Sequence, residues 1–263
     1  MLDLLALNLI GAFVIGGLWI TLTTVIAEKF GSTIGGVIVG LPSTSVVAFL
    51  FIGLAQSPAA ASQATTLFPI GYAFTALFLA AYVIFSKNRN FGSSIIGALG
   101  VWFVLSAGLD FSGITSFPIA LIGCAVITFI AFKVLSSSVR AKEEMERINY
   151  SLPQLLIRGI FSGGMIAGAV LISSVGGPIL GGIFSAFPAA YVSTLMIVNK
   201  SVGKEFSRMI ARPIVTGGFL SVITYIVSIR YLYPAIGLTY GTALSFAIAL
   251  VVAYLNYRLI KGK

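Results

Sequence analysis

The chain has no histidine, a single cysteine and few charged residues, which make up 9% of its 263 positions. Nucleophilic or metal-dependent catalysis needs a base, a thiol or a cluster of ligands, and this sequence supplies none of them. The lone Cys124 also excludes an internal disulfide. We therefore predict that the protein is not an enzyme and that it binds neither a metal ion nor another cofactor.

Acidic residues are also missing from the places where they would move protons. Asp and Glu together number 7, and none falls near the middle of an apolar segment. A proton relay through carboxylates inside the membrane is therefore not expected.

Apolar residues, in contrast, fill 58% of the chain and give it a mean hydropathy of +1.07. A water-soluble protein of this size needs far more charged surface. The first apolar stretch has no basic region before it and exceeds a signal peptide in length, so we interpret it as a retained span. We predict an all-α polytopic membrane protein with nine transmembrane helices, at residues 4–27, 31–55, 65–85, 93–109, 118–132, 155–172, 177–198, 210–229 and 236–257.

Basic residues collect in the short loops between these segments. With the N-terminus outside and the C-terminus inside, all but one of the 16 lysines and arginines fall on the cytoplasmic side, and only Arg230 falls outside. This partition follows the positive-inside rule. It also accounts for the net charge of +9, so no nucleic-acid partner is predicted. The expected location is the cell (plasma) membrane, with the lipid bilayer as the first partner.

The strongest pattern in the chain is an internal repeat. A shift of 146 positions aligns residues 8–47 with residues 154–193 without a gap. Because five predicted spans precede the second copy, the two copies would cross the membrane in opposite directions. The predicted organisation is a first repeat of five helices at 1–135, a cytoplasmic linker at 136–152 and a second, inverted repeat of four helices at 153–263. The aligned pairs include Gly17/Gly163, Gly31/Gly177, Gly35/Gly181, Gly36/Gly182 and Pro42/Pro188.

Each copy carries a proline near the middle of its second helix, which is the second or the seventh helix of the chain. Proline lacks an amide hydrogen and its ring crowds the carbonyl one turn earlier, so each helix should be broken there. Irregular backbone at this depth is tolerated only against protein or around a wet cavity. The paired breaks therefore predict a substrate-binding site, with the candidates Gly40, Pro42, Ser43, Thr44, Ser45, Ser185, Pro188, Tyr191 and Ser193.

The chemistry around the breaks favours a polar or negatively charged ligand. Hydroxyl groups at the start of a helix, together with its free amides, suit an anion or a polar headgroup. Arg212, at the cytoplasmic start of the eighth span, is a further candidate that would attract an anionic solute. Two alternatives stay open: the arginine side chain reaches the interface without binding anything, and the glycines and prolines serve helix packing alone.

A known family shows a similar motif. Residues 35–53 contain Gly35-Gly36, a short apolar run, Leu41-Pro42, small hydroxyl residues and an apolar tail. This stretch resembles the GlpM-like family of small integral membrane proteins, and residues 181–198 resemble it again, as though two such units were joined in tandem. The inverted plan is also similar to that of drug/metabolite transporters, which usually have ten spans. These resemblances imply duplication and a membrane location.

Inverted repeats recur in secondary transporters because the two halves can exchange conformations and open one site to each side in turn. We therefore predict a secondary transporter or exporter of a small polar or anionic solute that works by alternating access. The alternative is a non-catalytic membrane scaffold or lipid-interacting factor, or a lipid flippase. A homo-oligomer is compatible with each of these functions.

Overall fold

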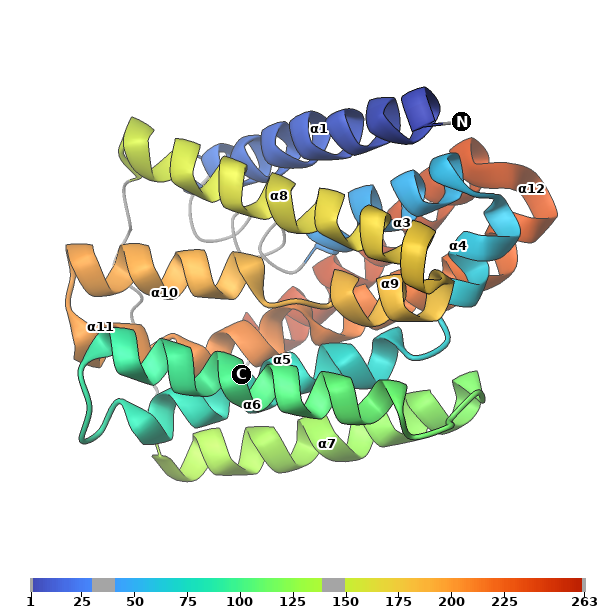
Figure 1. Cartoon of the computed structure of the whole chain (residues 1–263). Helices are drawn as coiled ribbons and strands as arrows, with labels where there is room; N and C mark the ends of the chain where they lie inside the picture. The colour runs from blue at the N-terminus through green and yellow to red at the C-terminus, as the bar shows by residue number, and fades with distance from the viewer. Residues whose placement is uncertain (1, 30–40, 139–149, 262–263) are drawn as a thin grey trace.

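The computed structural model describes residues 2–29, 41–138 and 150–261. Every regular element within these ranges is an α-helix, which confirms the predicted all-helical class. Figure 1 shows the helices lying side by side in one bundle. In chain order they are α1 (Leu2–Lys29), α3 (Ser43–Ala55), α4 (Pro58–Ala64), α5 (Phe68–Phe85), α6 (Phe91–Asp110), α7 (Phe117–Ser138), α8 (Leu152–Gly176), α9 (Pro178–Ser185), α10 (Ala189–Ser201), α11 (Lys204–Met209) and α12 (Ala211–Lys261).

In the described ranges, 7 helical stretches are long and apolar enough to cross a bilayer. Helices α1, α5, α6, α7 and α8 each match one predicted span, and α9 with α10 matches the seventh. The long α12 contains both the eighth and the ninth. Of the second predicted span only α3 lies in the described residues, and most of the predicted linker lies outside them. The membrane class is thus confirmed, whereas the count of nine and the orientation stay predictions.

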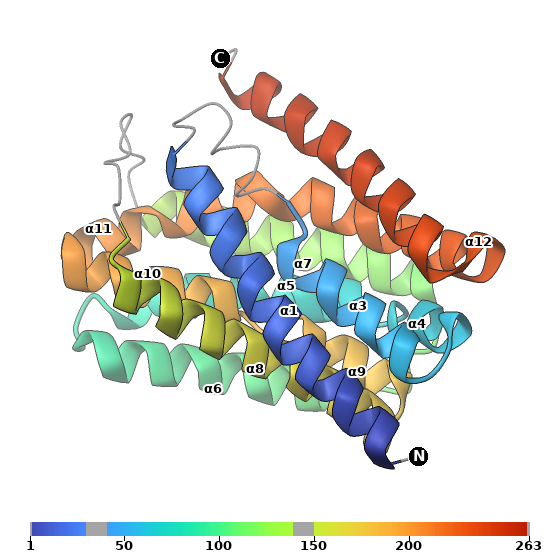
Figure 2. The ribbon, with the colours of Figure 1, turned by 90° about the horizontal axis from the view of Figure 1, so that it is seen from above.

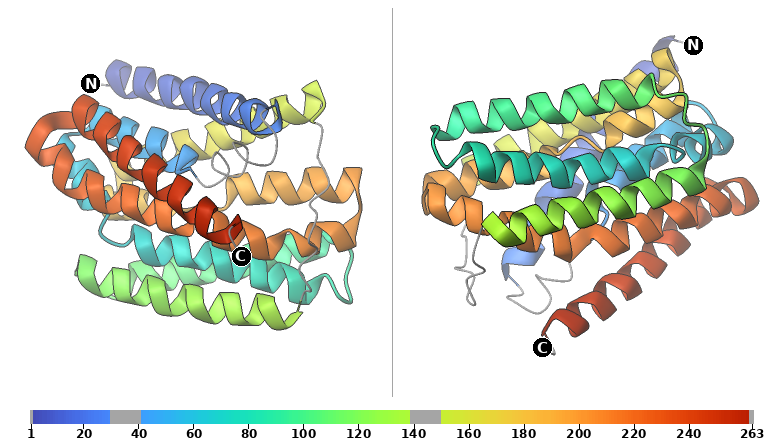
Figure 3. Two further views of the ribbon diagram at one scale, coloured as in Figure 1. Left: turned by 180° about the vertical axis from the view of Figure 1, so that it is seen from behind. Right: turned by 90° about the horizontal axis from the view of Figure 1, so that it is seen from below.

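Helix α12 is interrupted at Gly237, where φ is 78°. Glycine adopts this left-handed conformation without the steric cost that a side chain brings, and the nearby Pro234 cannot supply the amide that a continuous helix needs. Figures 2 and 3 show the chain reversing direction at this end of the bundle, so that the last part of α12 reaches away from the other helices. The break therefore separates α12 into two arms.

The helix boundaries repeat with the shift found in the sequence. Helix α10 starts and ends 146 residues after α3 (189 − 43 and 201 − 55). Helix α11 likewise starts 146 residues after α4 (204 − 58). Gly237 is likewise the equivalent of Phe91, the first residue of α6 (237 − 91). The second arm of α12 thus begins at the position equivalent to the start of α6.

The first helices of the two copies, α1 and α8, pack against each other and run antiparallel (Figures 1 and 2). A Cβ atom added at Gly17 would lie 2.8 Å from the carbonyl oxygen of Gly159, and one added at Gly163 would overlap the carbonyl of Phe13. Small residues allow such close approach of two backbones in a membrane. Gly17 and Gly163, which occupy equivalent positions, are therefore needed at this crossing.

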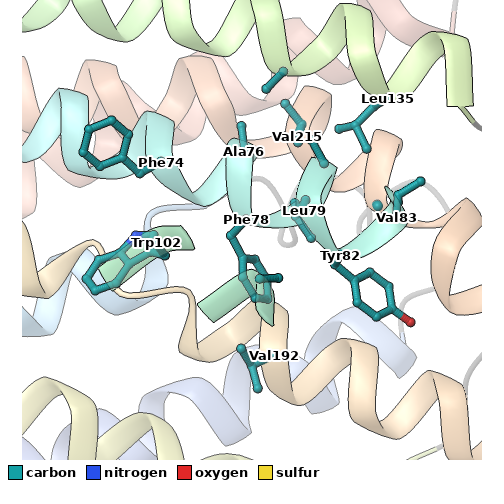
Figure 4. Packing of buried hydrophobic residues seen from close by; sticks show 14 of the residues in the cluster. Phe74, Ala76, Phe78, Leu79, Tyr82, Val83, Trp102, Leu135, Val192 and Val215 are labelled. Atoms are coloured by element: carbon teal, nitrogen blue, oxygen red, sulfur yellow. The ribbon is translucent and has the colours of Figure 1, made fainter. Parts of the chain in front are cut away.

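Helix α5 lies at the centre of the bundle, with 78% of its span buried, whereas only 22% of the α1 span is buried. Figure 4 shows Phe78 of α5 pointing toward Val192 of α10, with Trp102 of α6 on one side and Tyr82 of α5 on the other. The outer faces of the peripheral helices are apolar, as contact with lipid requires. The core that positions the two proline breaks is therefore built around α5.

Candidate functional site

The two predicted breaks have nearly the same backbone. Pro42, directly before α3, has φ −75° and ψ 51°, and Pro188, directly before α10, has φ −77° and ψ 41°. In each copy the first helical amide donates to the carbonyl two residues earlier, at 2.8 Å from Ser43 to Leu41 and at 2.8 Å from Ala189 to Phe187. Both prolines therefore begin a new helix with the same local geometry.

The residues after one break and around the other line a common cavity. Thr44 reaches it from α3, and Ser185 and Ala189 reach it from either side of Pro188. Ser162 of α8 completes its polar lining, and the rest of the wall is apolar. The space holds about one water molecule. The structure thus brings the two breaks together, as expected from their depth, although around a small cavity.

The remaining predicted site residues fall into several environments. Gly40 lies outside the described residues. Pro42, Ser45, Pro188 and Ser193 are buried, and Ser43 is partly buried.

Two hydroxyls of the predicted site bond to their own helices. Ser185 donates to the carbonyl of Gly182 at 2.7 Å, and Ser193 donates to that of Ala190 at 3.0 Å. A serine that bonds to its own helix in this way is satisfied without a ligand. Of these two, only Ser185 also lines the cavity.

Tyr191 faces a second, equally small cavity. Its hydroxyl lies 3.0 Å from that of Tyr72, which comes from α5. Thr75, Ala76, Val215 and Phe219 complete the wall of this cavity. Tyr191 therefore connects the start of α10 to the central helix, and Tyr72 is a residue that the sequence analysis missed because a lone tyrosine in an apolar helix gives no local signal.

Aromatic side chains pack around the second break. The ring of Phe187 lies 5.2 Å from that of Trp102, 5.7 Å from that of Phe103 and 6.0 Å from that of Phe184. Rings at such separations contribute packing energy beyond their buried area. The break before α10 is therefore held against α6 by aromatic contacts, whereas the equivalent position to Phe187 in the first copy is Leu41.

Arg212 does not line either cavity. Its guanidinium lies over the ring of Phe132 on α7, 5.3 Å from the centroid. Arg208, one turn earlier, pairs with Glu205 at 2.7 Å. The arginines at this end of the bundle thus have contacts of their own, and the structure does not bring Arg212 together with the predicted serines and threonine.

Two contacts that the sequence did not reveal join the copies at opposite ends of the bundle. At one end Arg230 of α12 donates to the hydroxyls of Thr65 and Thr66 at 3.0 and 3.2 Å and lies over the ring of Phe117. We name this the α4 end. At the other, the α11 end, Tyr82 of α5 and Ser207 of α11 share a hydrogen bond of 2.5 Å.

Glycine packing fixes the half-helix before the second break. A Cβ atom added at Gly182 would overlap the backbone carbonyl of Ala64, and one added at Gly181 would overlap Ser173. Helix α9 is thus held between α4 and α8 at backbone distance. The aligned glycines Gly35 and Gly36 lie outside the described residues.

Residues 2–29, 41–138 and 150–261 hold no group of three or more His, Cys, Asp or Glu residues placed to bind a metal ion.

Comparison with known families accounts for the repeat. The model described as "Protein of unknown function (DUF3147)" matches residues 9–115 and again residues 155–261. Both limits of the second match follow those of the first by the shift seen in the sequence (155 − 9 and 261 − 115), which confirms the predicted tandem duplication. Neither a search of curated proteins nor a search of solved structures gave a match. The GlpM-like resemblance stays a prediction. Because the two matches cover most of the chain, the protein belongs to the DUF3147 family.

Proposed function

We propose that this protein is a secondary transporter that moves a small polar solute by alternating access, with the solute bound where the two proline breaks meet. The observation that carries this proposal is the shared cavity: Thr44 after one break and Ser185 and Ala189 around the other line the same space, between equivalent parts of two copies. Transporters with inverted repeats bind their substrates at such interrupted helices near the middle of the membrane.

The arrangement of the copies supports an inverted repeat. Each family match spans four predicted crossings, and four crossings return the chain to the side on which it began. Helix α7 lies between the matches, outside both. One extra crossing makes the second copy enter from the opposite side, in agreement with the antiparallel α1 and α8 in Figure 1. The proposed topology is thus four helices, one linking helix and four helices, with the N-terminus outside.

The contacts at the two ends supply a route for alternating access. At the α4 end Arg230 of α12 binds Thr65 and Thr66, in the turn that follows α4. At the α11 end Tyr82 of α5 binds Ser207 of α11. Release of one contact while the other holds would open the cavity to one side only. The cavity holds about one water molecule in this structure, so it would have to widen to admit a solute.

A membrane scaffold is the second candidate, and two observations favour it. The cavity holds about one water molecule, and glycine contacts at Gly17, Gly163 and Gly182 pack the backbones closely. In this function the breaks and glycines serve only to join the helices.

Distance measurements between spin labels separate the two functions. One pair of labels at Gln63 and Tyr231 spans the α4 end, and a second pair at Asn88 and Val202 spans the α11 end; all four side chains are exposed. The protein carries Cys124→Ala and is studied in lipid nanodiscs. A pair at Ile84 and Val104, on α5 and α6 of the same copy, serves as the control.

A transporter gives two distance populations at each end, and a cross-link that closes one end shifts the other end to its longer distance. The control pair gives one population, because its helices move together. A scaffold gives a single population at both ends, and this result would remove transport as the proposed function.

A further inference from the structure

The cavity between the breaks contains a buried hydroxyl group with no partner. Ser162 is 0% exposed, and its hydroxyl makes no hydrogen bond within the described part of the chain. The same side chain lines the cavity opposite Thr44 and Ser185. A buried hydroxyl without a partner is unfavourable, and such groups in native proteins commonly mark a place where water or a ligand binds.

Many other serines and threonines in these helices bond to their own backbone. The hydroxyls of Ser106 and Ser245 are also buried without a partner in the described part of the chain, but unlike Ser162 they line neither cavity. In the same helix Ser174 donates to the carbonyl of Val170 at 2.9 Å, and on α1 Thr21 donates to that of Gly17 at 2.8 Å. A hydroxyl in a membrane helix usually bonds in this way to a carbonyl of the preceding turn. The hydroxyl of Ser162 makes no such bond. Its equivalent in the first copy is Gly16 (162 − 146), so this position of the repeat does not need a hydroxyl for the helix to form.

The lining of the cavity that Ser162 faces carries no charged side chain among the described residues. No Asp, Glu, Lys or Arg lines either cavity among the residues that the structure describes. Arg212 lies over Phe132, and Arg158 donates to Thr194 instead. An ion placed between these walls would lose its water and find no opposite charge, which is strongly unfavourable.

The partial charges of the two helix ends at the second break also offset each other. Helix α9 ends at Ser185 and presents the negative end of its dipole, while α10 begins at Ala189 and presents the positive end of its own. Each is equivalent to about half an elementary charge. Because the two ends face the same break, they favour a ligand that both donates and accepts hydrogen bonds over one that carries a net charge.

We propose that the cavity takes a small uncharged solute with hydroxyl or amide groups, and that Ser162 binds it together with Thr44 and Ser185. This inference rests on the proposed transport function and names the class of its substrate. The uncharged class differs from the anionic solute that the serine-rich start of α3 and Arg212 suggested from the sequence.

The test uses reagents that carry the same two-carbon chain and differ in charge. Ser162→Cys in a Cys124→Ala background is purified in detergent and treated with three methanethiosulfonates: the uncharged hydroxyethyl reagent, the anionic sulfonatoethyl reagent and the cationic trimethylammonioethyl reagent. Intact mass reports the rate of modification. Ser112→Cys, in an exposed loop, supplies the intrinsic ratio of the three rates. Ser193→Cys, buried but away from both cavities, measures reaction through the bundle at large.

Each rate at position 162 is divided by the rate of the same reagent at position 112. After this correction we expect the uncharged reagent to modify Ser162→Cys at least tenfold faster than either charged reagent. We expect Ser193→Cys to stay unmodified. Equal rates for a charged reagent would overturn the uncharged class and leave the transport proposal standing. Equal modification at positions 162 and 193, or no modification at 162, would overturn the role of Ser162; the spin-label distances then decide whether transport itself fails. Thr44→Cys repeats the test if Ser162→Cys does not fold.

Discussion

The breaks before α3 and α10 share a backbone and differ in their side chains. Pro42 and Pro188 agree within about 10° in φ and ψ, and the helices that follow both have 13 residues. Yet Ser43, Thr44 and Ser45 follow the first proline, whereas Ala189, Ala190 and Tyr191 follow the second. The comparison teaches that proline and the repeat fix the path of the chain, while each copy supplies its own chemistry to the space between them.

The two ends of the bundle also combine equivalent helices with different side chains. At the α4 end a charged group, Arg230, binds two threonines, and at the α11 end the neutral Tyr82 binds Ser207. Residue 84, the equivalent of Arg230, is an isoleucine. Equivalent helices thus join the copies at each end, but through unrelated side chains, so we expect the two contacts to differ in strength. The following substitutions test how far the copies have diverged.

The largest effect is expected at the glycine packing of the second copy. Gly182→Val places side-chain atoms against the backbone carbonyl of Ala64, which no rotamer can relieve. We expect a loss of about 3 kcal/mol or more in the free energy of unfolding, measured by SDS titration in mixed micelles. Gly164→Val is the control, because an added Cβ there meets no atom within 4 Å. Equal stability of the two variants would show that α9 moves away from α4 at little cost.

Tyr191→Ser makes the second break match the first, where Ser45 stands in the equivalent position. The substitution removes a buried ring and its hydrogen bond to Tyr72. We expect a loss of about 3 kcal/mol, chiefly from the space left behind. Tyr72→Phe, which removes only the hydrogen bond, should cost about 1 kcal/mol. If both variants lose the same amount, the ring of Tyr191 contributes nothing and the asymmetry of the breaks does not affect stability.

Arg230→Ala removes the contact at the α4 end. The guanidinium donates to Thr65 and Thr66 and lies 4.3 Å from the ring centroid of Phe117. Hydrogen bonds from a charged group predict a loss of about 2 kcal/mol. Arg230→Lys keeps the charge but neither the forked donors nor the stacking, so it should recover less than half of the loss. Full recovery by lysine would mean that charge alone holds this end.

The smallest effect is expected at the α11 end. Tyr82→Phe removes one neutral hydrogen bond, and Ser207 keeps its bond to the carbonyl of Lys204 at 2.7 Å. We expect a loss of about 1 kcal/mol in the same titration. Tyr240→Phe, at a tyrosine that is 74% exposed, is the matched control and should be neutral. A loss as large as that of Arg230→Ala would show that the two ends are held equally strongly.

Much of the fold could be predicted from the sequence because long apolar segments leave few choices in a bilayer. The α1, α5, α6, α7 and α8 helices lie where hydropathy placed them, and the shift of 146 was visible in paired glycines and prolines. The break in α12 was also predicted as a boundary between two spans. Its residue, Gly237, was not singled out, since an isolated glycine in an apolar run is common in membrane helices.

The candidate site was predicted only in part. Thr44 and Ser185 line the shared cavity, as the paired breaks suggested. Arg212 lies elsewhere, over Phe132 of α7. The direction of an arginine side chain near the start of a helix depends on neighbours that are far away in the sequence. Ser162 and Tyr72 were missed for the same reason: their importance comes from the residues opposite them and not from any local motif.

By itself, the sequence determined the membrane class, the tandem duplication and the presence of a break at each of two equivalent prolines. These features depend on composition, periodicity and the covalent geometry of proline, all of which act locally. Only the tertiary structure decided that the breaks share one small uncharged cavity, that Ser162 faces it without a partner, and that Arg230 and Tyr82 join the copies at opposite ends. These contacts connect residues that are far apart along the chain, so no pattern within a single segment could specify them.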